Sequence, residues 1–344
     1  YFSFHHIIID GDSIKLFCES LRKSYNEEIN KKFETDNNSS LKQSRSLNYF
    51  DYISYQGIFR KSVYYRQQID YLQSQFEDQY DFLSLPINKT TAIHSLYDSN
   101  AESVSLDPNT FNDLQKYALA NKIQVNSIFL TGLTLLLSNY CDTNDVVVGC
   151  ISNGRENNIS FKNIIGFFSN IMTLRLKLES GMHLNEFILY VNKKIKEGIL
   201  NQDYFYGEIV RDMNVHQDRN NKSLVQVIFN MQKSYDVKNQ WAGIDKVRFN
   251  LNRNDKIIYD LIIDIKYNNE GVIIKSEYSS ELFSDSLIKR FIQNYKYILE
   301  NILTNINLPI AEIPCVDVKE QELILKTFND TETHIKYENV FDIL

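Results

Sequence analysis

Hydrophobic positions recur along this chain with two different spacings, and these predict a mixture of helices and strands. Residues 284–306 carry apolar side chains at every third or fourth position, which is typical of a helix with one buried face. Residues 125–141 are apolar almost throughout, which predicts a buried helix. Residues 145–152 and 257–279 are rich in valine, isoleucine and tyrosine, which favours strands, the second being a hairpin that turns at 268–271.

The remaining elements follow from the same two patterns. Helices are expected over residues 60–78, 107–123 and 183–200, strands over residues 1–9, 102–107, 171–179 and 223–232, a loop over residues 31–46 and an extended connector over residues 83–89. A further helix is expected after Asp10-Gly11-Asp12, with Asp12 or Ser13 as its cap. Because strands and helices mix without a regular βαβ order, we expect a mixed α/β fold.

Composition and charge narrow the functional classes. The 344 residues leave room for two lobes, and the net charge of −7 without a basic stripe predicts no nucleic-acid partner. The four cysteines are scattered, which fits a reduced, cytoplasmic compartment better than a disulfide framework. No apolar helix is long enough to cross a bilayer, and no signal peptide or nucleotide-binding motif is evident, so we expect no membrane partner.

The candidate chemistry lies in the sequence HHIIIDGDS, residues 5–13. In a strand, His5 and His6 would point to opposite faces, so only one of the two imidazoles would serve a given site. A neutral imidazole is able to accept a proton from an attacking nucleophile, although a histidine hydrogen-bonded in a core is the commoner explanation. A zinc site is a third interpretation, for which adjacent histidines have poor spacing. Asp10, if buried, needs a cationic partner.

HHIIIDG also resembles HHxxxDG, the active-site signature of the condensation domains of non-ribosomal peptide synthetases. Further segments are similar to motifs of that family and occur in the same order, namely residues 49–56, 83–86, 145–155, 165–175, 201–204 and 219–232. The chain departs from the family's pattern at several positions, including Tyr55 in place of tryptophan, Ser169 in place of valine and Phe205-Tyr206-Gly207 in place of Pro-Phe-Glu.

The resemblance implies two chloramphenicol-acetyltransferase-like lobes that form a V around a tunnel. Residues 1–95 would be the C-terminal part of the N-lobe, residues 96–320 the C-lobe, and residues 321–344 a linker into an adenylation domain. In this family a considerable segment precedes HHxxxDG. The resemblance therefore implies an N-terminal lobe that is truncated in this sequence and a chain that is a fragment of a larger synthetase.

The resemblance further implies an enzyme that forms a peptide bond. The amine of an acceptor aminoacyl thioester would attack a donor acyl or peptidyl thioester. Both would arrive on phosphopantetheine arms of upstream and downstream peptidyl carrier domains, with an adenylation domain adjacent in the same chain. The domain itself would bind no cofactor and no metal. His6 matches the family's catalytic histidine, either as general base or as the group that orients the amine, and His5 precedes it in the motif.

Other residues of the motifs take expected roles from the same resemblance. Asp10 matches the family's structural carboxylate, which implies a salt bridge with Arg155 or, as the second choice, Arg175. Gly11 is expected to permit a tight bend that lets substrate approach the backbone. Candidates for the tunnel wall are Ser13, Asn170 and Gln202, with helix capping, a structural hydrogen bond and packing, respectively, as their alternative roles.

Three alternatives within the same fold stay open. An epimerisation domain shares HHxxxDG but usually lacks the Asn-Gln-Asp element found at 201–203. A stand-alone acyltransferase that uses coenzyme A would share the histidine but would not continue into an adenylation linker. A catalytically degenerate domain would dock carrier proteins without transferring an acyl group.

Overall fold

The computed structural model describes residues 2–31, 47–78, 80, 82–87, 97–155, 157–212, 223–234, 241–244, 256–268 and 271–331. Several predictions fall partly outside these ranges. Among them are residue 1 of the strand over 1–9, the loop over residues 31–46 apart from its first residue, residues 88–89 of the extended connector, residues 219–222 of the motif at 219–232, the two central residues of the hairpin turn at 269–270, and residues 332–344 of the expected linker.

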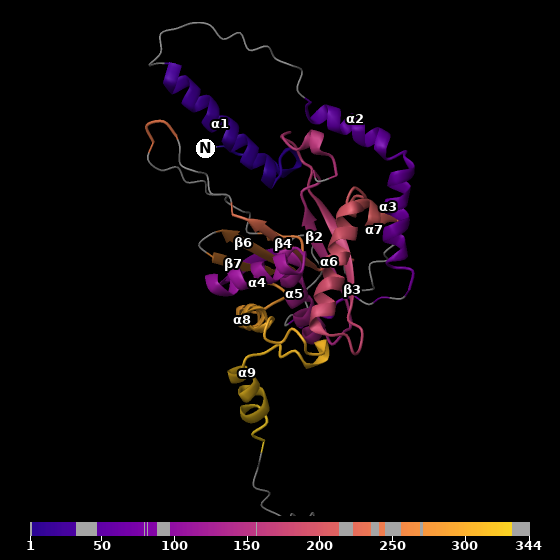
Figure 1. The fold of residues 1–344 in the computed structure, drawn as a ribbon, viewed down its shortest axis with the longest axis vertical. Helices are drawn as coiled ribbons and strands as arrows, with labels where there is room; N and C mark the ends of the chain where they lie inside the picture. The colour runs from indigo at the N-terminus through magenta and orange to yellow at the C-terminus, as the bar shows by residue number, and fades with distance from the viewer. Residues whose placement is uncertain are drawn as a thin grey trace, which may run out of the picture.

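A mixed sheet forms the centre of the molecule (Figure 1). Its strands are β1 (Tyr97–Leu106), β2 (Asp145–Ser152), β3 (Asn170–Lys177), β4 (Val227–Lys233), β5 (Lys256–Ile257), β6 (Leu261–Asn268) and β7 (Gly271–Ser279). Their order in the sheet is β3-β2-β4-β6-β7-β1-β5. Strand β4 runs parallel to β2 and β6, and the other neighbours are antiparallel. The predicted mixed α/β fold class is confirmed.

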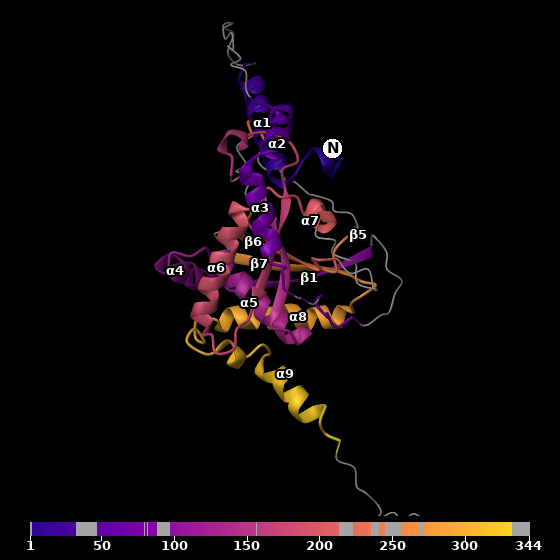
Figure 2. The same ribbon diagram turned by 90° about the vertical axis from the view of Figure 1, so that its right-hand side faces the viewer.

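Some helices pack on the two faces of this sheet, and others extend beyond it. The helices of the described residues are α1 (Gly11–Lys31), α2 (Tyr49–Phe59), α3 (Val63–Ser74), α4 (Pro108–Ala120), α5 (Val125–Cys141), α6 (Leu184–Leu200), α7 (Tyr206–Asp212), α8 (Asp285–Asn301) and α9 (Val318–Glu322). Helices α4, α5, α6 and α8 cover one face, and α8 runs beneath the sheet in both views (Figures 1 and 2). Helix α5 is buried around most of its circumference, which explains why its sequence is apolar almost throughout.

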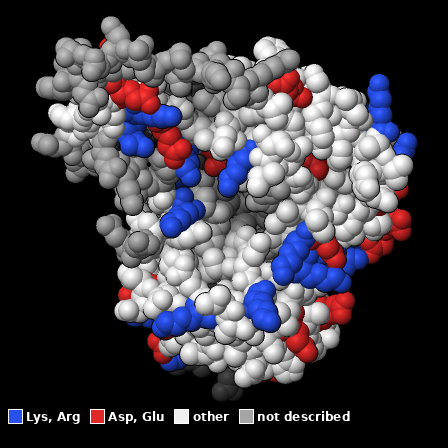
Figure 3. Space-filling model, turned by 45° about the horizontal axis from the view of Figure 1, so that its top comes forward, with Lys and Arg blue, Asp and Glu red and all other residues white. Residues whose placement is uncertain are grey.

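The opposite face of the sheet meets a smaller core. Leu72 and Phe76, in and just after α3, pack with Ile209 of α7 against Val147 and Ile228 of the sheet. Helices α1 and α2 extend beyond the end of β2, at the opposite end of the molecule from α9 (Figure 1). Seen from the α1–α2 end, the surface is hollowed, and Lys and Arg side chains border the hollow (Figure 3).

The strand predicted over residues 1–9 is wrong. A strand needs a hydrogen-bonded neighbour, and the described part of this segment has none. Its backbone instead closes local hydrogen bonds, from Ile8 N to His5 O (3.1 Å) and from Ile9 N to His6 O (3.3 Å), so that His6–Ile8 forms a 3₁₀ turn. The reasoning that placed His5 and His6 on opposite faces of a strand therefore does not hold.

Two further differences concern the helices. The sequence analysis does not anticipate α2, whose aromatic and apolar residues show little contrast between its faces. The helix predicted over residues 60–78 is shorter, because Ser62 caps a new helix by accepting a hydrogen bond from Tyr65 N. Helix α4 begins with Asp107 as its cap and Pro108 in its first turn, within the range predicted for a helix. Within the described ranges, none of the helices has the combination of length and hydropathy that crossing a bilayer requires.

Candidate active site

The turn that carries the two histidines fixes the proton on His6. Nδ1 of His6 lies 2.7 Å from the backbone carbonyl oxygen of Ile9. A carbonyl oxygen only accepts hydrogen bonds, so in the neutral ring Nδ1 carries the proton and Nε2 holds a free lone pair. The His5 ring is used differently, because its Nδ1 accepts a hydrogen bond from Ile7 N at 3.2 Å. Of the two histidines, it is His6 whose neutral ring leaves the Nε2 lone pair free.

The His6 ring is not sealed in a core. Its side chain is exposed, and its ring meets the edge of Phe167 with the two centroids 5.5 Å apart and the planes at 85°. It lines a cavity of about 720 Å³. A cavity of this size is in the range that small-molecule sites occupy. His6 therefore has both a lone pair and a space in which a reacting group would meet it.

Asp10 lies directly beneath this turn and is fully buried. Its carboxylate accepts hydrogen bonds from Arg155 Nη1 (2.8 Å) and Nη2 (3.1 Å), from Phe168 N (2.9 Å) and from Ser13 N (2.8 Å). Burial by itself raises the pKa of Asp10, but the hydrogen bonds from Arg155, Phe168 and Ser13 outweigh it and hold this pKa below its usual value. The carboxylate and the arginine matched in the sequence, Asp10 and Arg155, are therefore in direct contact.

Arg175, the second choice for that partner, lies elsewhere. Its guanidinium is buried and forms ion pairs with Asp145, one strand away, and with Asp78. Its guanidinium carbon lies 5.7 Å from the centroid of the Phe76 ring and 5.5 Å from that of the Tyr80 ring. Arg175 thus fixes the segment after α3 to the sheet and does not contribute to the Asp10 cluster.

Neither Ser13 nor Asp12, the two residues expected to cap α1, is its cap. Asp10 takes that role, since its carboxylate accepts the hydrogen bond from Ser13 N in the first turn. The Ser13 hydroxyl instead donates to Gly166 O (2.7 Å) and accepts from Gly166 N (2.9 Å) and from Arg155 Nη2 (2.7 Å). Ser13 is fully buried and does not line the cavity, so its role is to bind the loop after β2 to α1.

The loop segment Gly166–Phe168 lies between α1, α2 and the guanidinium of Arg155. Tyr49 of α2 donates a hydrogen bond to Phe167 O at 2.7 Å. The Arg155 guanidinium carbon lies 4.0 Å from the centroid of the Phe168 ring. A Cβ on Gly166 would come within 2.1 Å of the Tyr49 ring, so only glycine fits there. This segment holds Phe167 against His6 and thereby positions the catalytic candidate.

Gly11 does not serve the tight bend that was expected of it. It is the first residue of α1 and is not among the described glycines with a positive φ, so its backbone does not require a glycine for a bend. It does line the cavity, and a Cβ there would meet nothing within 4 Å. The glycine therefore leaves free space in the cavity wall, next to Asp12, which also lines the cavity.

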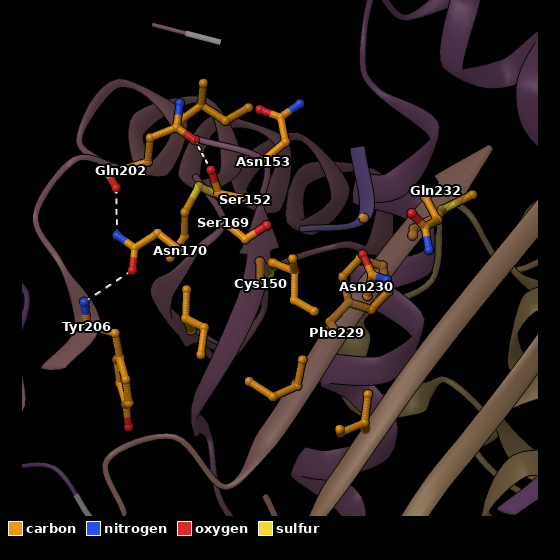
Figure 4. Close-up of a pocket in the computed structure, with 18 of the residues that line it drawn as sticks. Cys150, Ser152, Asn153, Ser169, Asn170, Gln202, Tyr206, Phe229, Asn230 and Gln232 are labelled. Carbon is orange, nitrogen blue, oxygen red and sulfur yellow. Dashed lines mark hydrogen bonds between the residues drawn. The ribbon is translucent and has the colours of Figure 1, made fainter. Parts of the chain in front are cut away.

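The polar wall of the cavity is built from β2, β3 and the segment after α6 (Figure 4). Asn170 is buried, donates to the backbone carbonyls of Gln202 (2.8 Å) and Tyr204 (3.0 Å), and accepts from Tyr206 N (3.2 Å). Gln202 is buried with its Oε1 hydrogen-bonded to the Ser152 hydroxyl, and within the described part of the chain its Nε2 has no hydrogen-bond partner. Both predicted residues line the cavity, and the amide of Asn170 holds the loop that supplies Gln202.

Several cavity residues have no counterpart in the sequence-based candidates. Asn230 and Gln232 of β4 line the wall, and Asn230 Nδ2 donates to Asp264 of the neighbouring strand at 2.8 Å. The signal was present in the sequence, because polar residues alternate with Phe229 and Met231 in a strand that would otherwise be apolar. Cys150 also lines the cavity, but burial raises its pKa to about 12, so it is a thiol and a poor nucleophile.

No group of three or more His, Cys, Asp or Glu side chains lies close enough to hold a metal ion among the residues that the structure describes. The polar groups that line the cavity are the His6 imidazole, side-chain amides, hydroxyls and the Asp12 carboxylate.

Comparison with known proteins identifies the family. The condensation-domain family model matches residues 1–325. Surfactin synthase subunit 1 of Bacillus subtilis (strain 168) is 25% identical over 336 residues, which cover 96% of this chain and 9% of that protein. Bacitracin synthase 1 of Bacillus licheniformis is 24% identical over 331 residues, covering 96% of this chain and 6% of that protein. The chain thus spans less than a tenth of the length of these relatives.

A solved structure agrees on the fold. The first condensation domain of the calcium-dependent antibiotic synthetase, in complex with a substrate analogue, superposes with a TM-score of 0.69 at 17% sequence identity. The match covers 90% of this chain and 65% of that chain.

Proposed function

The chain belongs to the condensation-domain family. From this membership and the geometry at His6, we propose that it catalyses the formation of an amide bond from two substrates that are each bound as a thioester. The donor is an acyl or peptidyl thioester, and the acceptor is the amine of an aminoacyl thioester. Each is carried on the phosphopantetheine arm of a carrier domain, and the domain itself binds no cofactor. This assignment extends to the residues of the site as follows.

His6 is the proposed proton acceptor. When the acceptor amine attacks the donor carbonyl carbon, a C–N bond forms and the nitrogen gains positive charge. Nε2 of His6, left unprotonated by the contact between Nδ1 and Ile9 O, takes the excess proton. The C–S bond then breaks, and the departing thiolate receives a proton from the imidazolium. Protons and electrons balance without any further reactant.

Alignment is expected to contribute at least as much as proton transfer. General-base catalysis typically supplies about 10²–10⁴-fold in rate. Holding two reactants in line supplies about 7–11 kcal/mol of the barrier in favourable cases. A thioester is already an activated acyl donor, so the cavity wall that orients both thioesters is part of the mechanism. We therefore expect loss of the His6 ring to reduce the rate severely without abolishing it.

The partners follow from the same proposal. Upstream and downstream peptidyl carrier domains would deliver the two thioesters. Residues 1–95 would contribute the N-lobe side of the site, residues 96–320 the C-lobe, and residues 321–344 would lead toward an adenylation domain in the same polypeptide. Support comes from the family model and from relatives that are very much longer than this chain.

The observation that carries the proposal is the fixed tautomer of His6 in the wall of the cavity. The test incubates the protein with donor-loaded and acceptor-loaded carriers and measures the products by intact mass. A dipeptidyl acceptor carrier is the expected product, and His6→Ala should form it about 10²–10⁴-fold more slowly. His183 provides a matched control, because its Nδ1 also contacts a backbone carbonyl, that of Asn307, but it does not line the cavity.

Other outcomes would contradict the proposal. Inverted stereochemistry of a loaded amino acid without transfer would indicate an epimerisation domain. Transfer from acyl-coenzyme A but not from a carrier would indicate a stand-alone acyltransferase. Carrier binding without any transfer would indicate a docking domain. Equal rates for His6→Ala and His183→Ala would remove His6 from the mechanism.

A further inference from the structure

The cavity beside His6 contacts side chains from both faces of the sheet. Phe229 and Met231 of β4 pack with the core beneath the helices, whereas Ile228 packs with the core on the opposite face. Asn230 shares the face of Ile228, because side chains alternate along a strand. All four residues line the same cavity. A single space reaches both faces only if it passes through or around the sheet.

The gap between β2 and β4 provides that passage. These two strands pair only at Gly149–Ile228 and Cys150–Phe229, whereas β4 pairs with β6 from Val227 to Lys233. Beyond Cys150 the strands separate. Figure 4 shows Cys150 and Ser152 on one strand, and Phe229, Asn230 and Gln232 on the other. The cavity therefore continues between two strands toward the helices.

On the helix side the cavity ends in an inner chamber, which we define by the residues Asn126, Cys150, Met172, Ile195, Ile199 and Met231. Its walls are apolar apart from Asn126, whose buried Oδ1 has no hydrogen-bond partner among the residues that the structure describes. Met172 and Ile195 are 9% and 3% exposed, whereas Asn126, Ile199 and Met231 are half-buried. A Cβ on Gly198 would lie 2.8 Å from Leu174, so α6 packs closely on the sheet beside the chamber.

We propose that the inner chamber binds an aliphatic chain carried by a thioester substrate, either a fatty acyl group or a long apolar side chain. This inference rests on the proposed function and adds the class of substrate. Interiors are normally packed without voids larger than a water molecule, and an unfilled apolar space forfeits dispersion contacts. A chain that enters between β2 and β4 fills this space, while the thioester carbonyl stays on the side of the cavity that His6 and Gly11 line.

The proposal is tested by binding, with probes that do not react. S-alkyl pantetheine thioethers, from ethyl to decyl, are titrated into the protein by calorimetry. Affinity is expected to rise about fourfold for each added methylene, which corresponds to a transfer free energy of about 0.8 kcal/mol, until the chamber is full. Ile199→Phe should end this rise at a shorter chain, and Met172→Ala should extend it to a longer one.

Ile273→Phe is the matched control, because this isoleucine of β7 is 55% exposed and does not line the cavity. It should keep the wild-type dependence on chain length. The inference is overturned if affinity does not depend on chain length, or if neither Ile199→Phe nor Met172→Ala shifts the chain length at which the rise ends. If Ile199→Phe does not fold, Met172→Ala decides alone.

The two proposals fail separately. Thioethers cannot transfer an acyl group, so the binding series is independent of catalysis. A protein that shows the chain-length dependence but forms no dipeptidyl carrier refutes the proposed function alone. A protein that forms the dipeptidyl carrier but binds all thioethers equally refutes the inner chamber alone.

Discussion

Arg155 holds the carboxylate of Asp10 through two parallel hydrogen bonds, although the residues are 145 positions apart in the sequence. Both side chains are buried. Asp10 ends the turn that carries His6 and caps α1, while Arg155 lies in the loop after β2. The pair therefore joins the histidine turn to the wall of the cavity, and the position of the His6 lone pair depends on it.

Removal of one partner should destabilise the protein strongly. Arg155→Ala leaves the Asp10 carboxylate buried without its cation, so we expect the free energy of unfolding to fall by about 3–5 kcal/mol. Urea denaturation measures this change, and the rate of dipeptidyl-carrier formation should fall with it because the His6 turn loses its support. The exposed pair Lys116–Asp113 is the control, and Lys116→Ala should change the free energy of unfolding by less than about 1 kcal/mol. Wild-type stability and full activity in Arg155→Ala would contradict the role given to the pair.

The same pair predicts how stability depends on pH. The pKa of Asp10 is lower in the folded protein than its ordinary value of 3.8, because the hydrogen bonds from Arg155 and two backbone amides outweigh the effect of burial. As the pH falls through 3.8, the unfolded chain therefore binds more protons at Asp10 than the folded protein does. The stabilisation from Asp10 is present above the unfolded pKa and is lost as the pH falls toward the folded one.

Urea denaturation from about pH 6 down to about pH 2 measures this loss. Asp10→Asn should start from a lower stability and lose less of it on acidification than the wild type. If the stability of the two proteins fell identically on acidification, Asp10 would not be the group that controls the loss of stability at low pH.

The sequence predicted the elements around the cavity better than it predicted the turn at its centre. Helices such as α5 and strands such as β2 can be predicted from long apolar runs in the sequence, because most residues of each element are buried. The segment before Asp10 is also apolar and aromatic, but its 3₁₀ turn depends on single contacts such as that between His6 and Ile9. Local hydrogen bonds of this kind leave no periodic signal.

Long-range contacts explain the remaining differences. Ser13 has the sequence signature of a helix cap, but Gly166 and Arg155 occupy its hydroxyl, and Asp10 caps the helix instead. The pairing of Asp10 with Arg155 was accessible from the sequence only through the family's motifs. The inner chamber was not accessible at all, since it depends on the point at which β2 and β4 stop pairing.

The contact between Gly166 and Tyr49 predicts a coupled pair of substitutions. Gly166→Ala places a methyl group within 2.1 Å of the Tyr49 ring and should lower the free energy of unfolding by about 1–3 kcal/mol. Tyr49→Ala in the same protein removes the clash, so the double variant should be less destabilised than the sum of the two single variants. Thermal and urea denaturation measure both. Gly57→Ala, at a helical glycine with open space around its Cβ position, is the control and should not destabilise the protein. Additive effects would mean that the ring and the glycine do not oppose each other.

Gly11 provides a case in which stability and activity should move in opposite directions. The first turn of α1 accepts alanine, so Gly11→Ala should leave the free energy of unfolding unchanged or raise it by up to about 1 kcal/mol. Its methyl group would enter the cavity on the side that His6 lines, and even a small displacement of a bound thioester should reduce kcat/KM for dipeptidyl-carrier formation by about 10–100-fold. Gly207→Ala, in the first turn of α7 and outside the cavity wall, matches the change in backbone and should keep full activity. If Gly11→Ala retains the wild-type kcat/KM, substrate does not pass over this residue, and the reacting groups must meet His6 from another side.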